Sequence, residues 1–332
     1  MRRPILISGV ILAATIALSG CGDAGSSGTE AAPSGSASGG AKQACAAVAG
    51  TDLVVLDDDK KLQTVDNLIP AVNGDKGSPA LVAALDKVSA VLTTDDLVGL
   101  NKQADVDRKS PASVAKEYAN SKGLLTPSSG GSGKVTVGAA NFSENQIVAN
   151  LYASALNAAG FEATVRTVGN REVYLPELQK GNLTVVPEYV GTLTEFLNKK
   201  ENGANAEAKA SSDLDATVKA LAALGLKSGL VFGKPAEAAD QNAFAVTKAF
   251  ADKNGVKTLS DLGSKCGALV LGGPPECPQR PFCQPGLEKT YGLQFGSFKA
   301  LDAGGPLTKS ALKSGAIAIG LVFSSDGSLA AG

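Results

Sequence analysis

Apolar residues recur at helical spacing near the start of the chain. Between positions 79 and 100 the series is Leu81, Val82, Leu85, Val88 and Leu92, which predicts the buried face of a helix. The sequence TTD at 93–95 can cap a second helix at its N-terminus. Ser110-Pro111 predicts the start of a third helix, which we expect to end at residue 122.

A different pattern begins at residue 134, where short apolar stretches alternate with stretches of helical spacing. We expect strands at 134–138, 163–168 and 183–186, and helices at 146–159, 172–180 and 212–224. Ser143 is the expected N-cap of the first of these helices. Alternation of this kind is typical of a parallel sheet covered by helices on both faces.

The alternation starts again at residue 242. We expect strands at 243–246, 268–271 and 316–323, with helices starting at Thr247 and Leu259. The pattern therefore predicts an α/β chain with two lobes.

The first residues have the pattern of an export signal. Arg2 and Arg3 precede an apolar stretch at 5–18 that is too short to span a membrane comfortably. The sequence LSGC, which ends at Cys21, resembles the bacterial lipobox, in which the cysteine is lipidated; the alternative is an ordinary secretory peptide. We expect a signal peptide at 1–20 and a flexible tether at 21–50, which is rich in Ser, Gly and Ala. The mature chain is then extracytoplasmic and anchored to the cell membrane by lipid.

Composition excludes several functional classes. The chain has 332 residues, 31 Lys and Arg against 32 Asp and Glu, and a net charge of −1, so it lacks the basic surface of a nucleic-acid-binding protein. It has no histidine, which excludes Ser-His-Asp catalysis and HExxH zinc sites. No pair of carboxylates stands out as a general acid and base. We expect neither an enzyme nor a bound cofactor or metal.

Four cysteines remain once Cys21 is set aside, and an even number suits an oxidising compartment. Three pairings are possible. Cys277 and Cys283 flank a short proline-stiffened loop, which favours a local disulfide, and Cys45–Cys266 then follows by elimination.

Four polar segments each follow a predicted strand. They lie at 141–145, 169–174, 187–192 and 323–327. Ligands bind outside the carboxyl ends of the strands in open parallel sheets, so we expect these segments to face one crevice.

These segments together resemble the substrate-binding proteins of quaternary-amine ABC transporters. The sequence GNLTVVPEYVGT at 181–192 is similar to the GxIDxxxEYTGT signature of that family, QPGLEKTYGL at 284–293 to its GLxxxYGL segment, and FSSDG at 323–327 to its aromatic-S/T-T-D-G segment. The resemblance implies a type II periplasmic-binding-protein-like fold with the ligand cleft between its lobes. It also implies capture of glycine betaine, choline, carnitine or proline betaine for delivery to an ABC permease.

The order of segments differs from that of the family. The family's closing piece resembles residues 53–125 and stands here at the front, joined by the Ser- and Gly-rich linker 126–133, so the resemblance implies a circular permutation. We expect lobe 1 at 51–232 and lobe 2 at 233–332. Residues 233–240 then form the only covalent crossing, and the Cys45–Cys266 disulfide acts as a second tether between the lobes.

The resemblance also implies the site. A quaternary ammonium has no N–H to donate and is recognised by aromatic faces. The expected cage residues are Phe142, Tyr174, Tyr189 and Phe323, although each could instead be a core residue.

Polar candidates complete the expected site. Arg280 is the expected partner of a betaine carboxylate, with Arg171 as a second candidate. Further polar contacts are expected from Asn141, Ser143, Thr192 and Asp326.

The cage has fewer tyrosines than the family usually provides, and the segment 302–307, where another aromatic is expected, has none. A different zwitterion or an amino-acid-like solute is therefore an alternative ligand. A sensory or adhesive surface lipoprotein of the same fold is the alternative function.

Overall fold

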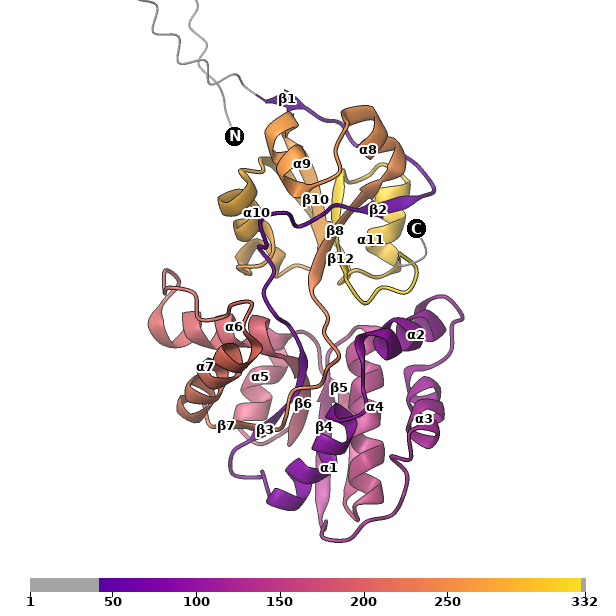
Figure 1. Cartoon of the computed structure of the whole chain (residues 1–332), viewed down its shortest axis with the longest axis vertical. Coiled ribbons are helices and arrows are strands. Elements are labelled where there is room, and N and C mark those ends of the chain that lie inside the picture. Colours follow the sequence, from indigo (N-terminus) through magenta and orange to yellow (C-terminus); the bar gives the residue numbers. More distant parts are fainter. Residues whose placement is uncertain (1–41, 330–332) are drawn as a thin grey trace, which may run out of the picture. The chain divides into compact units, whose positions relative to one another are not determined.

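The computed structural model describes residues 42–329, which form two sheets of five strands, each flanked by helices (Figure 1). The predicted signal peptide, Cys21 and most of the predicted tether lie outside these residues. Within the described part of the chain, no helix is both long and apolar enough to cross a membrane.

Lobe 1 contains the first of the two sheets. Its strand order is β5 (Glu162–Thr167), β4 (Lys134–Ala139), β6 (Val185–Tyr189), β3 (Leu68–Asn73) and β7 (Leu230–Phe232). The first three strands are parallel, and β3 runs antiparallel to both of its neighbours.

Helices cover both faces of this sheet, because alternate residues of its strands face opposite ways. Leu68 and Val72 pack with one set of helices, whereas Ile69 and Ala71 pack with the other. The first set is α1 (Pro79–Ser89), α2 (Thr94–Asp105), α3 (Pro111–Ser121) and α4 (Ser143–Ala158). The second set is α5 (Arg171–Gln179), α6 (Val190–Asn202) and α7 (Leu214–Lys227) (Figure 1).

Lobe 2 repeats the same strand pattern. Its order is β11 (Phe295–Ala300), β10 (Leu269–Gly273), β12 (Ile319–Phe323), β8 (Asn242–Thr247) and β2 (Leu53–Val55), with β8 antiparallel to both neighbours. Its helices are α8 (Lys248–Asn254), α9 (Leu259–Lys265), α10 (Gln284–Tyr291) and α11 (Pro306–Lys313). A two-stranded ladder pairs β1 (Gln43–Ala44) with β9 (Cys266–Gly267), and a 3-10 turn, η1, spans Cys277–Gln279. The expected two-lobe α/β fold is therefore confirmed, and each sheet is mainly parallel.

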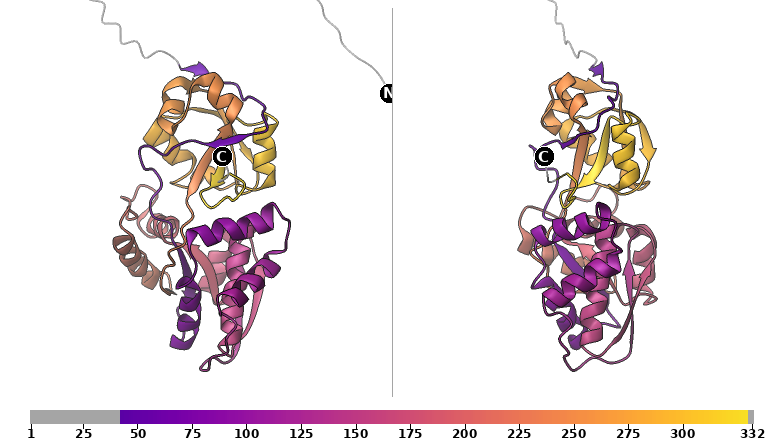
Figure 2. Two further views of the ribbon diagram at one scale, coloured as in Figure 1. Left: turned by 45° about the vertical axis from the view of Figure 1, so that its right-hand side comes forward. Right: turned by 90° about the vertical axis from the view of Figure 1, so that its right-hand side faces the viewer.

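The expected lobe boundary at residue 51 is wrong. Strand β2 pairs with β8 and lies among the elements of lobe 2 in every view (Figures 1 and 2). The chain therefore crosses between the lobes twice, at about 63–67 and again at 234–241. The two crossings contact each other, since Asn67 forms a β-bridge with Ala239 and the amide of Asp240 donates to the carbonyl of Asp66 over 3.1 Å. A short apolar stretch predicts a strand but not which sheet it completes, and this is why the boundary was misplaced.

The structure joins Cys45 to Cys266 and Cys277 to Cys283, with Cα atoms 5.2 and 5.3 Å apart. Cys45 and Cys266 both lie at the β1–β9 ladder of lobe 2. Their disulfide is therefore not a tether between the lobes, and the second tether is the chain itself.

Strand β3 was not expected from the sequence, and Pro70 lies in its middle. It is nevertheless fully buried, and Pro70 stands opposite Pro187 of β6. The Pro70 carbonyl accepts from Gly233 and the Pro187 carbonyl from Asn145, so the backbone polar groups of the two prolines point away from each other. No ladder hydrogen bond between β3 and β6 is lost at this pair.

Two of the three expected N-terminal helix caps are confirmed. Thr93 caps α2 in a capping box with Asp96, and Ser110 caps α3. Ser143 is not the N-cap of α4, which begins at Ser143 after Phe142. Its hydroxyl donates instead to Asp105 of α2 over 2.6 Å.

Candidate ligand-binding site

A cavity lies where segments from both lobes and from the crossings meet. Among the residues that line it are Asn141, Phe142, Tyr174, Tyr189, Thr192, Arg280 and Phe323, all of which were expected at the site. The carboxyl ends of β4, β6 and β12 bring most of them there, since Asn141 follows β4 closely while Tyr189 and Phe323 end their strands.

Ser143 and Asp326 do not line this cavity but a second, neighbouring one. Phe142 and Phe323 line both cavities, and their rings stack with centroids 5.6 Å apart. The stacked pair joins lobe 1 to lobe 2. Asp326 is already paired with Lys309 at 2.5 Å.

Six aromatic side chains line the first cavity. They are Phe142, Tyr174, Tyr189, Phe196, Phe282 and Phe323. Phe196 and Phe282 were not expected. Phe196 lies on α6, seven residues or about two helical turns after Tyr189, and Phe282 lies next to Cys283. Both residues could have been found in the sequence from their spacing to residues already expected at the site.

The two tyrosines are held by buried carboxylates. Tyr174 is 3% exposed and its hydroxyl donates to Glu188 over 2.7 Å. Tyr189 is 7% exposed and donates to Glu144 over 2.7 Å. Both rings are therefore part of the packed interior as well as of the cavity wall, and neither can turn away from the cavity without leaving a buried carboxylate short of a donor.

Arg171 is already paired. Its Nε and Nη2 donate to the two Glu188 oxygens over 2.8 and 2.6 Å, and Nη2 also donates to Thr192. Burial opposes the charge on Arg171, but the Glu188 carboxylate beside it raises the pKa of the guanidinium above its usual value. In the sequence, Glu188 belongs to the signature-like segment 181–192. In the structure, it is the hydrogen-bond partner of both Arg171 and Tyr174.

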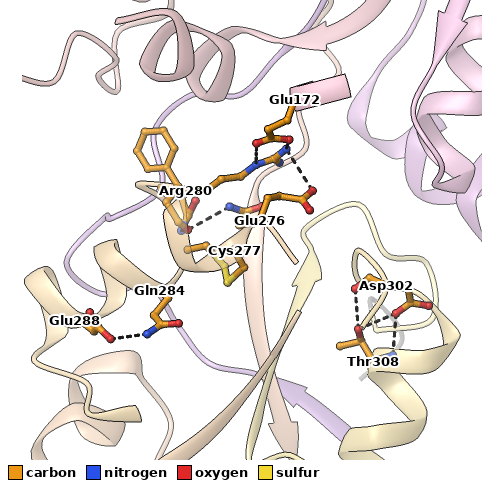
Figure 3. The surroundings of a disulfide bond; sticks show 12 residues. Glu172, Glu276, Cys277, Arg280, Gln284, Glu288, Asp302 and Thr308 are labelled. Atoms are coloured by element: carbon orange, nitrogen blue, oxygen red, sulfur yellow. Dashed lines mark hydrogen bonds and ion pairs between the residues drawn. A yellow bond between two sulfur atoms is a disulfide. The ribbon is translucent and has the colours of Figure 1, made fainter. Parts of the chain in front are cut away.

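Arg280 also has carboxylate partners (Figure 3). Its Nε and Nη2 donate to Glu172 of α5 over 3.2 and 2.9 Å, and Nη2 lies 3.3 Å from Glu276. Glu276 in turn accepts from Asn170 over 3.1 Å. Lobe 2 is thus linked to lobe 1 through Arg280 and Glu276, and the guanidinium is not free.

Carboxylates that were not expected complete the wall. Asp66 and Asp240 come from the two crossings and line the cavity with Glu276. Burial raises the pKa of Asp66 to about 7. Burial, together with the charge of nearby Glu144, also holds the pKa of Asp240 well above its usual value.

Asp66 is fixed by the start of α6, where the amides of Gly191 and Thr192 donate to it over 2.8 and 2.9 Å. A Cβ at Gly191 would lie 2.2 Å from the carbonyl oxygen of Val65, so only glycine allows this approach.

The cavity therefore combines aromatic faces with carboxylates, and both of its guanidiniums have partners. Such a wall favours a positively charged group. Within residues 42–329 no cluster of three or more acidic or cysteine side chains is arranged to hold a metal ion.

Two comparisons with known proteins gave matches. The family model described as the substrate binding domain of ABC-type glycine betaine transport systems matches residues 43–121 and 133–331. A solved structure described as a glycine betaine/carnitine/choline ABC transporter shares 23% identity, covers 59% of this chain and 71% of its own, and superposes with a TM-score of 0.38. The assignment rests on the family match, which extends over most of the chain.

Proposed function

Because the chain belongs to the family of substrate-binding domains of ABC-type glycine betaine transport systems, we propose that it captures a quaternary-ammonium solute between its two lobes. The family is one of transport proteins and not of enzymes. The observation that carries the choice of solute is the aromatic and acidic wall of the cavity between the lobes. Binding by aromatic faces needs no hydrogen-bond donor on the ligand and makes or breaks no covalent bond.

Among quaternary amines, the cavity suits a cation better than a betaine. A betaine carboxylate would have to displace Glu172 from Arg280, or lie near Asp66 and Asp240. We expect choline to bind up to about fivefold more tightly than glycine betaine, because separating the partly exposed Glu172 from Arg280 costs about 1 kcal/mol or less.

The test is calorimetric titration of the mature chain with choline, glycine betaine, carnitine, proline betaine and free amino acids. Tighter binding of glycine betaine would show that the Arg280–Glu172 pair opens to accept a carboxylate. Binding of amino acids alone would contradict the proposed solute class.

Affinity for a cation is expected to depend on pH through Asp66. A cation favours the ionised carboxylate, so the affinity should increase as the pH rises through about 7, where Asp66 loses its proton. We expect the dissociation constant of choline to fall about three- to tenfold between about pH 5.5 and pH 8. The charged Arg171 and the titratable Asp240 are the neighbours of Asp66.

The matched variant is Asp66→Asn, which keeps an oxygen for the amides of Gly191 and Thr192 but does not titrate. It should bind choline more weakly above pH 7 and show a smaller pH dependence. An unchanged dissociation constant for the unmodified protein over this range would contradict a role for Asp66.

Delivery to an ABC permease and anchoring through Cys21 are further parts of the proposal. The family match supports an extracytoplasmic substrate-binding role, and the LSGC sequence supports the anchor. Export of a Cys21→Ser variant in place of the unmodified protein tests the anchor. The variant should be released from the membrane fraction, and its retention there would argue against lipidation.

The permuted order is also part of the proposal. The family match is interrupted at 122–132, which connects α3 to β4. Leu329 packs in the same apolar cluster as Leu53 of β2, so the end of the described chain lies near the strand that the family's order would place after it. A chain reordered to begin at residue 134 and to carry residues 42–121 after residue 329 should fold and bind as the present chain does. Failure of that chain to fold would count against the permutation.

A further inference from the structure

A buried carboxylate next to the cavity is bonded from three directions. Glu144, in the first turn of α4, is 4% exposed. Its Oε1 accepts from the Tyr189 hydroxyl over 2.7 Å. Its Oε2 accepts from Asn101 of α2 over 2.7 Å and from the Ser325 hydroxyl over 2.6 Å.

Ser325 belongs to lobe 2, where it follows β12, and its other polar groups are bonded as well. Its amide donates to Asp240 in the second crossing over 3.0 Å, and its carbonyl accepts from Asn101 over 3.2 Å. Asn101, Glu144, Tyr189, Asp240 and Ser325 thus form one buried cluster, which we call the Glu144 cluster. It joins α2, α4 and β6 of lobe 1 to the end of β12.

Burial raises the pKa of Glu144, whereas hydrogen bonds from Ser325, Tyr189 and Asn101 favour its ionised form. Tyr189, Asn101 and Ser325 all donate to Glu144, so the side chain at 144 must accept at both oxygens. A glutamine has the same shape but turns a donor toward either Tyr189 or the pair Asn101 and Ser325. Hydrogen bonds to a charged acceptor are also stronger than neutral ones, so the contacts of the cluster are weaker in the amide.

The position of Glu144 gives this requirement a functional meaning. Glu144 and Ser325 line the neighbouring cavity and not the one proposed for the ligand, whereas Tyr189 lines the ligand cavity. One carboxylate therefore holds an aromatic wall of the ligand site and also holds lobe 2 against lobe 1.

We propose that Glu144 is a positioning residue that couples the ligand cavity to lobe closure: it fixes Tyr189 and keeps Ser325 docked on lobe 1, and so slows ligand release. The part that concerns the ligand rests on the proposed function. The link between Glu144 and Ser325 does not, because it is a contact between lobes whatever the solute.

The variant to make is Glu144→Gln in the mature chain. Its matched control is Glu195→Gln in α6, since Glu195 is also buried but accepts from the amides of Lys209 and Ala210 within lobe 1. Ser325→Ala removes the lobe 2 donor without changing any residue of the ligand cavity.

Two quantities are measured, amide hydrogen exchange of residues 324–326 without ligand and the dissociation rate of choline. We expect Glu144→Gln and Ser325→Ala to speed exchange at 324–326 and to raise the dissociation rate by about tenfold, with little change in the association rate. Glu195→Gln should change neither quantity, although it lowers stability. If Glu144 has only a structural role, Glu144→Gln will lower stability as Glu195→Gln does and will leave both quantities unchanged. That result would overturn the inference.

The two proposals fail in different ways. If the unmodified protein binds none of the quaternary amines, the proposed function is wrong, and the exchange at 324–326 alone decides whether Glu144 holds the lobes. If the protein binds choline but Glu144→Gln exchanges and releases ligand as the unmodified protein does, the inference is wrong and the proposed function stands.

Discussion

Tyr189→Ala is expected to weaken choline binding by about 30- to 100-fold, or about 2 to 2.8 kcal/mol at 1.4 kcal/mol per tenfold. The substitution removes an aromatic face from a desolvated site, where one cation–π contact is worth about 2 kcal/mol. It also leaves Glu144 without one of its donors and opens the cavity wall to water. Calorimetric titration measures the change directly.

The control is Tyr118→Ala, because Tyr118 is buried to the same extent, 8% against 7% exposed, but lies on α3. Its loss should lower the free energy of unfolding and leave the dissociation constant of choline unchanged. Tyr189→Phe keeps the ring and loses the hydroxyl, so its affinity should lie between those of the unmodified protein and Tyr189→Ala. Equal affinities of Tyr189→Ala and Tyr118→Ala for choline would show that Tyr189 does not contact the ligand.

Glu188→Ala is expected to lower the free energy of unfolding by about 3–5 kcal/mol. Arg171 and Glu188 are 5% and 0% exposed, so removing the carboxylate leaves a buried guanidinium with no counter-charge. The Tyr174 hydroxyl loses its acceptor at the same time. Urea unfolding followed by circular dichroism gives the difference.

Glu172, which follows Arg171 on α5, provides the comparison. Glu172 pairs with Arg280, but their side chains are 38% and 29% exposed, so Glu172→Ala should cost about 1 kcal/mol or less. The double variant Arg171→Met with Glu188→Leu should recover much of the stability lost in Glu188→Ala, because it removes both members of the buried ion pair. Equal costs for Glu188→Ala and Glu172→Ala would contradict the importance of the buried pair.

The periodicity of the chain predicts most elements of lobe 1 because they are local. The capping box at Thr93 and the alternation after residue 134 depend on residues that lie close together in the sequence. Two features depend on distant partners and were not predicted correctly. Strand β3 contains a proline that the sheet tolerates because its backbone polar groups point away from β6 at that pair. Strand β2 completes a sheet whose neighbouring strand lies about 190 residues further along.

In the candidate site, too, local features were predicted from the sequence and contacts between distant residues were not. Tyr189 and Phe323 end strands, so the pattern places them at the crevice, and the family resemblance supplies their expected role. Whether a charged side chain is free depends on its neighbours in space. Arg280 lies at the cavity as expected, but Glu172 of the other lobe occupies its fork. Glu144 was passed over because a glutamate in the first turn of a helix is common on surfaces and needs no partner there.

The place of β2 in lobe 2 has a consequence for how the chain folds as it emerges from export. Residues 66–232 contain every strand of the lobe 1 sheet, so that lobe can fold before the last hundred residues have appeared. Strand β2 emerges before all of them and stays unpaired until β8 follows, Leu53 then meeting Thr247. Cys45 likewise waits for Cys266, 221 residues later. The earliest part of the folded domain to emerge is thus among the last to be placed, and during that interval both an edge strand and a thiol are open to wrong partners.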